Sequence, residues 1–165
     1  MHDLLEQIEK ALEYNLYYLA LQSTLALPDI CGALESENGQ ANRTKYINWY
    51  NTYAKEDSIN AISGDDCYKF RCSAIHQGST EHGNSSYDRI MFIEPSINGI
   101  SFHNNTMDNV LNIDLKIFCN NMLSAVREWL KTVEQNPNFN KNYTHFMKRY
   151  PNGFSPYIVG IPVIS

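Results

Sequence analysis

The sequence predicts a mainly α protein with a single domain, a bundle of about four to five helices with a β-hairpin inserted near residues 88–103. Three observations lead to this fold class. Apolar residues recur every three or four positions through several long stretches. Strand-forming residues concentrate in one short region after residue 88. The 165 residues suit one hydrophobic core, and no linker or internal repeat divides them.

Composition and charge exclude some classes of function. The net charge is −5, so no overall basic field draws the chain to nucleic acid or membrane. The cysteines lack the spacing of a zinc site and are expected to be buried free thiols in a reducing cytosol. The acidic start differs from a signal peptide, and no run approaches the ~20 apolar residues of a membrane span. We therefore expect a cytoplasmic protein without a membrane partner.

The first third of the chain is expected to be helical. A first helix runs from about residue 3 to residue 23, and it is apolar on nearly all sides from Tyr14 onward, which predicts burial on more than one side. Pro28 suits the first turn of a second, short helix over about 29–35. A third helix, over about 42–54, has an aromatic side.

The stretch from Ser63 to Gly78 has the clearest boundaries in the sequence. Ser63 is a good N-cap, and Asp66 follows three residues later, as in a capping box. Asp65 and Asp66 place negative charge at the positive end of the helix dipole. Gly78 stands where a left-handed residue commonly ends a helix. We therefore predict a helix over residues 64–77.

The second half is expected to combine the hairpin with one more long helix. Arg89–Ile93 and residues 100–103 are the two predicted strands, with a turn at 95–99 between them. The long helix begins at Leu111 or Asp114 and ends at about residue 133, before Asn136-Pro137-Asn138. The tail, residues 136–165, is locally basic and ends in an apolar stretch, which we expect to pack on the bundle or on a partner.

Arg71 lies near the middle of an apolar arc of its helix, at ~100° per residue. An unpaired buried charge is costly, so this arginine needs a partner. It pairs with a core carboxylate, such as one from the first helix, or reaches an edge of the protein, or faces a subunit interface or an anionic ligand. His76, in the last turn of the helix, is either a polar cap or a proton-transfer group.

The segment Arg71-Cys72-Ser73-Ala74-Ile75-His76 resembles the R-x4-6-H motif of the HEPN superfamily. The resemblance covers about residues 1–135 and implies an HEPN-like helical bundle that forms homodimers, in which the motifs of two protomers meet in one cleft. Many members are metal-independent ribonucleases that act as toxins or antiviral effectors. Others have lost catalysis and bind RNA or serve as sensor or docking domains.

The sequence departs from the family pattern in two places and raises one geometric question. Cys72 follows the arginine where a polar residue, commonly Asn, is typical. Gly78 takes the place of a tyrosine often present in members paired with a nucleotidyltransferase antitoxin. Arg71 and His76 lie about 140° apart on an ideal helix, so a cleft between crossing helices or a local distortion near Gly78 is needed to bring them together.

The resemblance implies that Arg71 and His76 are catalytic. RNA supplies its own nucleophile, the 2′-hydroxyl, so His76 would move protons while Arg71 holds the phosphate. Lys69 and Ser73, on the His76 side of the helix, are expected to contact the substrate phosphate. No metal and no cofactor are expected.

The expected function is therefore a metal-independent endoribonuclease that acts as a homodimer in a toxin or phage-defence setting. Its expected partners are RNA and an antitoxin or defence-system protein. The alternative is a non-catalytic HEPN-like domain that binds RNA, a nucleotide or a partner protein. A third possibility is a helical interaction protein in which the motif is accidental.

Overall fold

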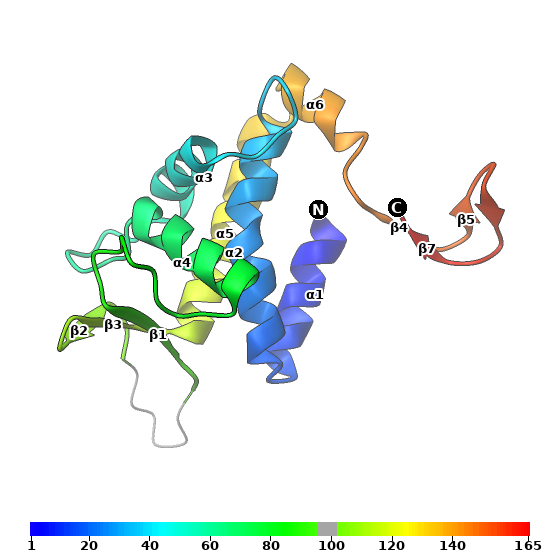
Figure 1. The fold of residues 1–165 in the computed structure, drawn as a ribbon. Coiled ribbons are helices and arrows are strands. Elements are labelled where there is room, and N and C mark those ends of the chain that lie inside the picture. The colour runs from blue at the N-terminus through cyan, green and yellow to red at the C-terminus, as the bar shows by residue number, and fades with distance from the viewer. Residues whose placement is uncertain (96–101) are drawn as a thin grey trace.

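In the computed structural model, which describes residues 1–95 and 102–165, the chain is mainly α, as predicted. Figure 1 shows α2 beside α5 at the centre, with α1 on one side and α3 and α4 on the other. None of the helices formed by the described residues combines the length and hydrophobicity that crossing a bilayer would require. The helices are α1 (His2–Glu13), α2 (Tyr17–Leu34), α3 (Arg43–Trp49), the π-helical turn η1 (Tyr50–Ala54), α4 (Gly64–Gln77), α5 (Leu115–Val133) and α6 (Pro137–Tyr143).

The chain reverses between α1 and α2, so the single helix predicted over residues 3–23 is wrong. Asn15 takes a left-handed conformation with φ of 58°, and the Leu16 amide bonds to the Ala11 carbonyl at 2.8 Å, which closes the first helix. The short helix predicted at 29–35 is also wrong as a separate element, because α2 continues through Pro28 to Leu34. The apolar surface of α2 is explained by its contacts with α1, α3, α4 and α5.

The strands form a small sheet rather than the predicted hairpin. β1 (Arg89–Ile93) was predicted, but it pairs in parallel with β3 (Val110–Asp114), and β2 (Asn105–Met107) pairs antiparallel with the other edge of β3. The first two residues of the second predicted strand, 100–103, lie outside the described residues, and its last two residues are not in a strand. The hairpin that does form, β2–β3, turns at Asp108 and Asn109, which both adopt positive φ.

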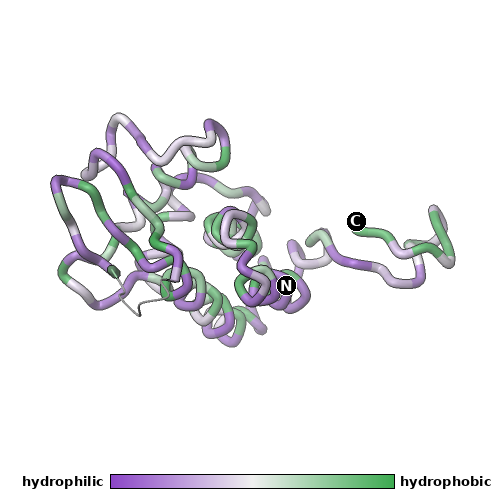
Figure 2. The backbone as a smooth tube through the Cα atoms, turned by 90° about the horizontal axis from the view of Figure 1, so that it is seen from below, coloured by the Kyte–Doolittle hydropathy of each residue, from purple (hydrophilic) through white to green (hydrophobic). Residues whose placement is uncertain are grey.

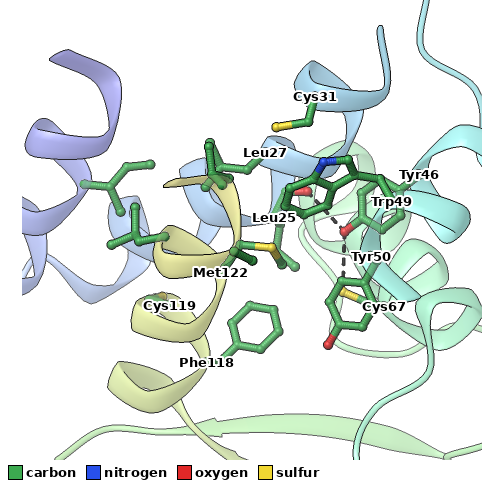
Figure 3. Close-up of a cluster of buried hydrophobic side chains, with 14 of the residues drawn as sticks. Leu25, Leu27, Cys31, Tyr46, Trp49, Tyr50, Cys67, Phe118, Cys119 and Met122 are labelled. Atoms are coloured by element: carbon green, nitrogen blue, oxygen red, sulfur yellow. Dashed lines mark hydrogen bonds between the residues drawn. The ribbon is translucent and has the colours of Figure 1, made fainter. Parts of the chain in front are cut away.

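Figure 3 shows the part of the core that lies between α2, α3, α5 and the start of α4, and the same core extends to α1 and to the β1–β3 strands. Leu25, Tyr46 and Trp129 are completely buried. The polar side-chain atoms of the tyrosine and the tryptophan each have a hydrogen-bond partner. The Tyr46 hydroxyl lies 3.2 Å from the Leu25 carbonyl, and the Trp129 indole donates to Glu35 at 3.0 Å. Such satisfied polar groups let large aromatic side chains enter the core without a desolvation penalty.

The Asn136-Pro137-Asn138 segment begins a helix that the sequence analysis missed. The Asn136 side chain accepts from the amides of Asn138 and Phe139, and Pro137 occupies the first turn of α6, where its missing N–H costs nothing. Phe139 then packs against Trp129, with ring centroids 5.6 Å apart. The segment that follows the end of α5 therefore also caps the start of α6.

Residues 144–165, which we call the C-terminal arm, extend away from the bundle (Figures 1 and 2). The base of the arm does pack on its own bundle, where Phe146 contacts the core and Lys148 and Arg149 lie beside the start of α1. The outer apolar stretch does not, so packing on the bundle, one of the two predicted arrangements, does not hold for that stretch. The arm contains two short antiparallel pairs, β4 (Arg149–Tyr150) with β7 (Val163–Ile164) and β5 (Gly153–Phe154) with β6 (Ile158–Val159). Gly153 has a φ of 88°, and a Cβ there would lie only 2.3 Å from the Ile158 carbonyl oxygen, so this turn requires glycine.

Candidate active site on helix α4

Helix α4 has the boundaries that the sequence predicts. The Ser63 hydroxyl accepts from the Asp66 amide at 3.0 Å, and Gly78 ends the helix in the left-handed conformation with φ of 64°. Both signals are local in sequence, which is why they could be read without the fold. The helix thus presents Arg71 and His76 in its last two turns, at the end that faces the first turns of α2.

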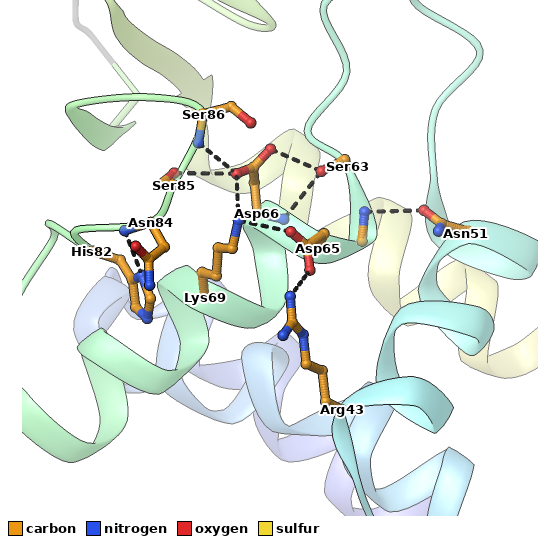
Figure 4. A network of polar contacts seen from close by, with 11 residues as sticks. Arg43, Asn51, Ser63, Asp65, Asp66, Lys69, His82, Asn84, Ser85 and Ser86 are labelled. Carbon is orange, nitrogen blue, oxygen red and sulfur yellow. Dashed lines mark hydrogen bonds and ion pairs between the residues drawn. The ribbon is translucent and has the colours of Figure 1, made fainter.

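At the start of α4, Asp66 holds the following loop against the helix (Figure 4). Its carboxylate accepts from the Ser86 amide at 2.8 Å, the Ser85 hydroxyl at 3.2 Å and the Ser63 hydroxyl at 2.8 Å. Burial opposes ionisation of this group, but these hydrogen bonds outweigh it and lower the pKa of Asp66. The loop after α4 therefore lies along the face of the helix that carries Asp66.

The structure does not bring Lys69 or Ser73 to the predicted site. Ser73 lies on the Asp66 side of α4 and is completely buried, and its hydroxyl has no hydrogen-bond partner among the described residues. A substrate phosphate cannot reach it, so this prediction is wrong. The Lys69 ammonium lies 2.7 Å from the Asp65 carboxylate near the helix start. It is two turns from His76, roughly 10 Å along the helix axis.

Arg71 and His76 do meet, within one chain. The Arg71 Nη1 atom lies 3.2 Å from the His76 Nε2 atom, despite the angular separation of the two positions on the helix. The arginine side chain is long enough to bend along the helix surface toward the next turn. Neither of the two devices invoked from the sequence, a cleft between helices or a distortion near Gly78, is needed, because Gly78 is an ordinary helix end.

The partner that Arg71 requires is Asp29 of α2. The Arg71 Nη2 atom lies 2.5 Å from the Asp29 Oδ2 atom, and the two side chains are only 19% and 12% exposed. This ion pair confirms the first of the three alternatives weighed for the arginine, a core carboxylate. Burial raises the pKa of Asp29, although the adjacent Arg71 charge acts in the opposite direction. Burial acts to lower the pKa of Arg71, but the attraction of the Asp29 carboxylate is among the effects that outweigh burial, and the pKa is raised. The guanidinium therefore stays ionised.

The surroundings of the pair divide the guanidinium into a buried edge and an accessible edge. The Arg71 Nε atom is buried without a hydrogen-bond partner among the described residues, and the Tyr68 ring lies 6.0 Å from the guanidinium carbon. The Nη1 atom instead faces His76, which is exposed to solvent. Among the described residues, the His76 side is therefore where an approaching anion would meet a cation and an imidazole together.

Asp29 is the site residue that the sequence analysis did not name. A signal was present, because Asp29 is the only charged residue between positions 14 and 34. An isolated acid in an apolar segment needs a buried partner, and Arg71 is an isolated base in an apolar arc. In comparisons with models of known families, with curated proteins and with solved structures, none matched this chain.

Proposed function

We propose that this chain is a HEPN-type, metal-independent endoribonuclease that acts as a homodimer, with Arg71 and His76 as its catalytic residues. The single observation that supports the proposal best is the 3.2 Å approach of Arg71 Nη1 to His76 Nε2 at the exposed end of α4. Phosphodiester cleavage through the 2′-hydroxyl needs a group that transfers protons and a group that stabilises negative charge, and an imidazole beside a fixed guanidinium provides both.

In the proposed reaction His76 acts as general base and removes the proton from a ribose 2′-hydroxyl. The 2′-oxygen forms a bond to phosphorus, the bond from phosphorus to the 5′-oxygen breaks, and a 2′,3′-cyclic phosphate results. Arg71 holds the non-bridging oxygens as negative charge develops on them. In the homodimer, the second copy of His76 would give a proton to the departing 5′-oxygen. Asp29 contacts no substrate in this scheme and is a positioning residue for Arg71.

The biological setting in this proposal is that of a toxin or a phage-defence effector, with an antitoxin or defence-system protein as partner. The alternative is a non-catalytic HEPN-like domain that binds RNA, a nucleotide or a protein. The observation in its favour is that Asp29 already occupies one edge of the guanidinium. A binding domain could use the remaining edge to hold a phosphate without cleaving anything.

Cleavage of a mixed-sequence RNA in the presence of EDTA separates these functions. We expect the wild-type chain to cut the RNA, and both His76→Ala and Arg71→Ala to lose at least about a hundredfold in rate, as expected for loss of an acid–base or charge-stabilising group. His2→Ala is the matched control, because His2 is an exposed histidine on α1. Its rate should equal that of the wild type.

Two other outcomes would count against the enzyme. If the wild type binds RNA in a filter assay but leaves it intact, and Arg71→Ala weakens that binding, the binding domain is favoured. If cutting persists unchanged in both site variants, the activity belongs to a contaminant or another site, and the proposal fails.

A further inference from the structure

The C-terminal arm carries an apolar surface that the chain itself leaves uncovered. Tyr157 is 80% exposed, Val159 74% and Ile161 63%, and all three lie at the outer end of the arm in or next to the β5–β6 pair. Monomeric proteins seldom expose contiguous apolar side chains of this size, and such surfaces mark interfaces. The outer end of the arm is therefore a candidate interface.

The arm is ordered before it binds. Reciprocal hydrogen bonds between the main chains of Lys148 and Ser165, at 2.7 and 3.0 Å, close its base. The Phe154 ring packs between the rings of Tyr150 and Tyr157, with centroids 4.7 and 5.9 Å away. An element that is already folded pays less conformational entropy on association, so a small apolar tip can contribute useful affinity.

A second uncovered apolar surface lies where α1 turns into α2. We call it the corner patch, and it consists of Tyr14, Leu16, Tyr18 and Leu19, each at least half exposed. A shallow groove of about 380 Å³ runs along it, and Glu94 lies at the edge of this groove. Two uncovered apolar surfaces on one chain, one protruding and one grooved, have the complementary shapes that an interface between copies requires.

Charge favours the same pairing. The arm, residues 144–165, contains Lys148 and Arg149 and no acidic residue, although the whole chain carries a net charge of −5. The exposed side of α1 carries Glu6 and Glu13 toward the corner patch, against a single exposed lysine, Lys10, while Asp3 lies at the start of the helix beside the arm of its own chain. A basic arm is thus attracted to an acidic helix that ends in an apolar groove.

The two surfaces lie at opposite ends of α1, which decides between the same chain and another chain. The base of the arm lies beside Met1, at the start of α1, and the corner patch lies at the end of that helix. The arm points away from its own corner patch (Figure 1). A two-fold axis that sets two α1 helices antiparallel brings the start of each α1, with the base of the arm beside it, to the corner patch of the other copy.

We propose that the C-terminal arm docks on the corner patch of a second copy of this chain, so that two arms are exchanged in a symmetric dimer. This inference deepens the homodimer of the proposed function and rests on it for the expectation that the chain self-associates. The new element is the pair of surfaces that make the contact, the arm and the corner patch. The experiment measures association and not RNA cleavage, so the two proposals can fail separately. A dimer without ribonuclease activity refutes only the enzyme, and a dimer that cleaves RNA but persists in the arm variant refutes only the arm exchange.

Sedimentation equilibrium of the full chain tests the exchange. The wild type should have twice the 19.0 kDa mass of one chain. The arm variant Val159→Asp/Ile161→Asp and the patch variant Leu19→Asp should each weaken association at least about tenfold, since each places a charge in an apolar contact. Ile59→Asp is the control, because Ile59 is completely exposed in a loop outside both surfaces, and it should associate like the wild type.

Mixing the two defective variants gives a second readout. A mixed dimer contains one wholly intact contact, made by the arm of the Leu19→Asp chain and the patch of the arm variant. The mixture should therefore associate more strongly than either variant alone. Circular dichroism checks that each variant is folded, and Tyr157→Ser replaces the arm variant if it is not. A wild type of single-chain mass, an arm variant that still dimerises fully, or a mixture no stronger than its parts would overturn the proposal.

Discussion

At the scale of single residues, the candidate site depends on one ion pair that joins two helices. Asp29 and Arg71 are each an isolated charge among apolar residues, and each neutralises the other. Their contact also aims the free edge of the guanidinium at His76. The need for a partner to Arg71 was predictable from the sequence, because it follows from the cost of a buried charge. The identity of that partner was not stated, since it depends on how α2 and α4 cross.

Replacing Asp29 with Asn should therefore destabilise the protein by roughly 2 kcal/mol, because it leaves the Arg71 charge largely buried without its anion. Urea denaturation followed by circular dichroism measures this change in the free energy of unfolding. Glu9→Gln breaks a pair whose side chains are 41% and 39% exposed, and it should cost less than about 1 kcal/mol. Asp29→Leu/Arg71→Met, which removes both charges, should be more stable than Asp29→Asn alone. A double variant that is less stable would show that the charges do not act as a pair.

At the scale of secondary-structure elements, most local signals were read correctly, with the Asn136 cap of α6 as an exception, and distant ones were not. The caps of α4 and the Asp114 cap at the start of α5 are short-range hydrogen bonds that the residue types reveal. The turn at Asn15 has no glycine or proline to mark it, so the sequence reads as one continuous helix. The parallel pairing of β1 with β3 joins residues about twenty positions apart, and periodicity cannot detect such a pairing.

The end of α4 gives a test at this scale. Gly78→Ala should destabilise the protein by about 1 kcal/mol, because Gly78 has a φ of 64° and an alanine there is strained even though its Cβ would meet no neighbouring atom. Gly83→Ala is the matched control, since Gly83 also has open space around it but lacks a positive φ. Its unfolding midpoint in urea should stay close to that of the wild type. Equal midpoints for the two variants would contradict the assigned helix end.

At the scale of the whole molecule, the core encloses three of the four cysteines. Cys31, Cys67 and Cys119 are completely buried, and burial raises the pKa of Cys67 to about 12 and that of Cys119 to about 11. Cys72, beside Arg71, is only partly buried. The expectation of buried free thiols is thus met by three cysteines, while Cys72 is more accessible than expected. Only the packing of α4 against α2 and α3 determines which thiol is accessible.

A thiol reagent such as DTNB should therefore modify one cysteine quickly in the native protein and the other three only on unfolding in guanidinium. The fast phase should disappear in Cys72→Ser, while the three slow thiols remain. Counting thiolate release at 412 nm as a function of time gives both amplitudes. Two or more fast thiols in the native state would contradict the described core.

The chemistry at Arg71 and His76 is tested most directly by the ends of the RNA fragments that the wild type produces in EDTA. Mass spectrometry of those fragments should find a 2′,3′-cyclic phosphate on one side of the cut and a 5′-hydroxyl on the other, because the 2′-oxygen is the proposed nucleophile. The same ends should be missing from the His76→Ala reaction. Fragments with a 3′-hydroxyl and a 5′-phosphate, or cyclic ends that persist without His76, would contradict the account.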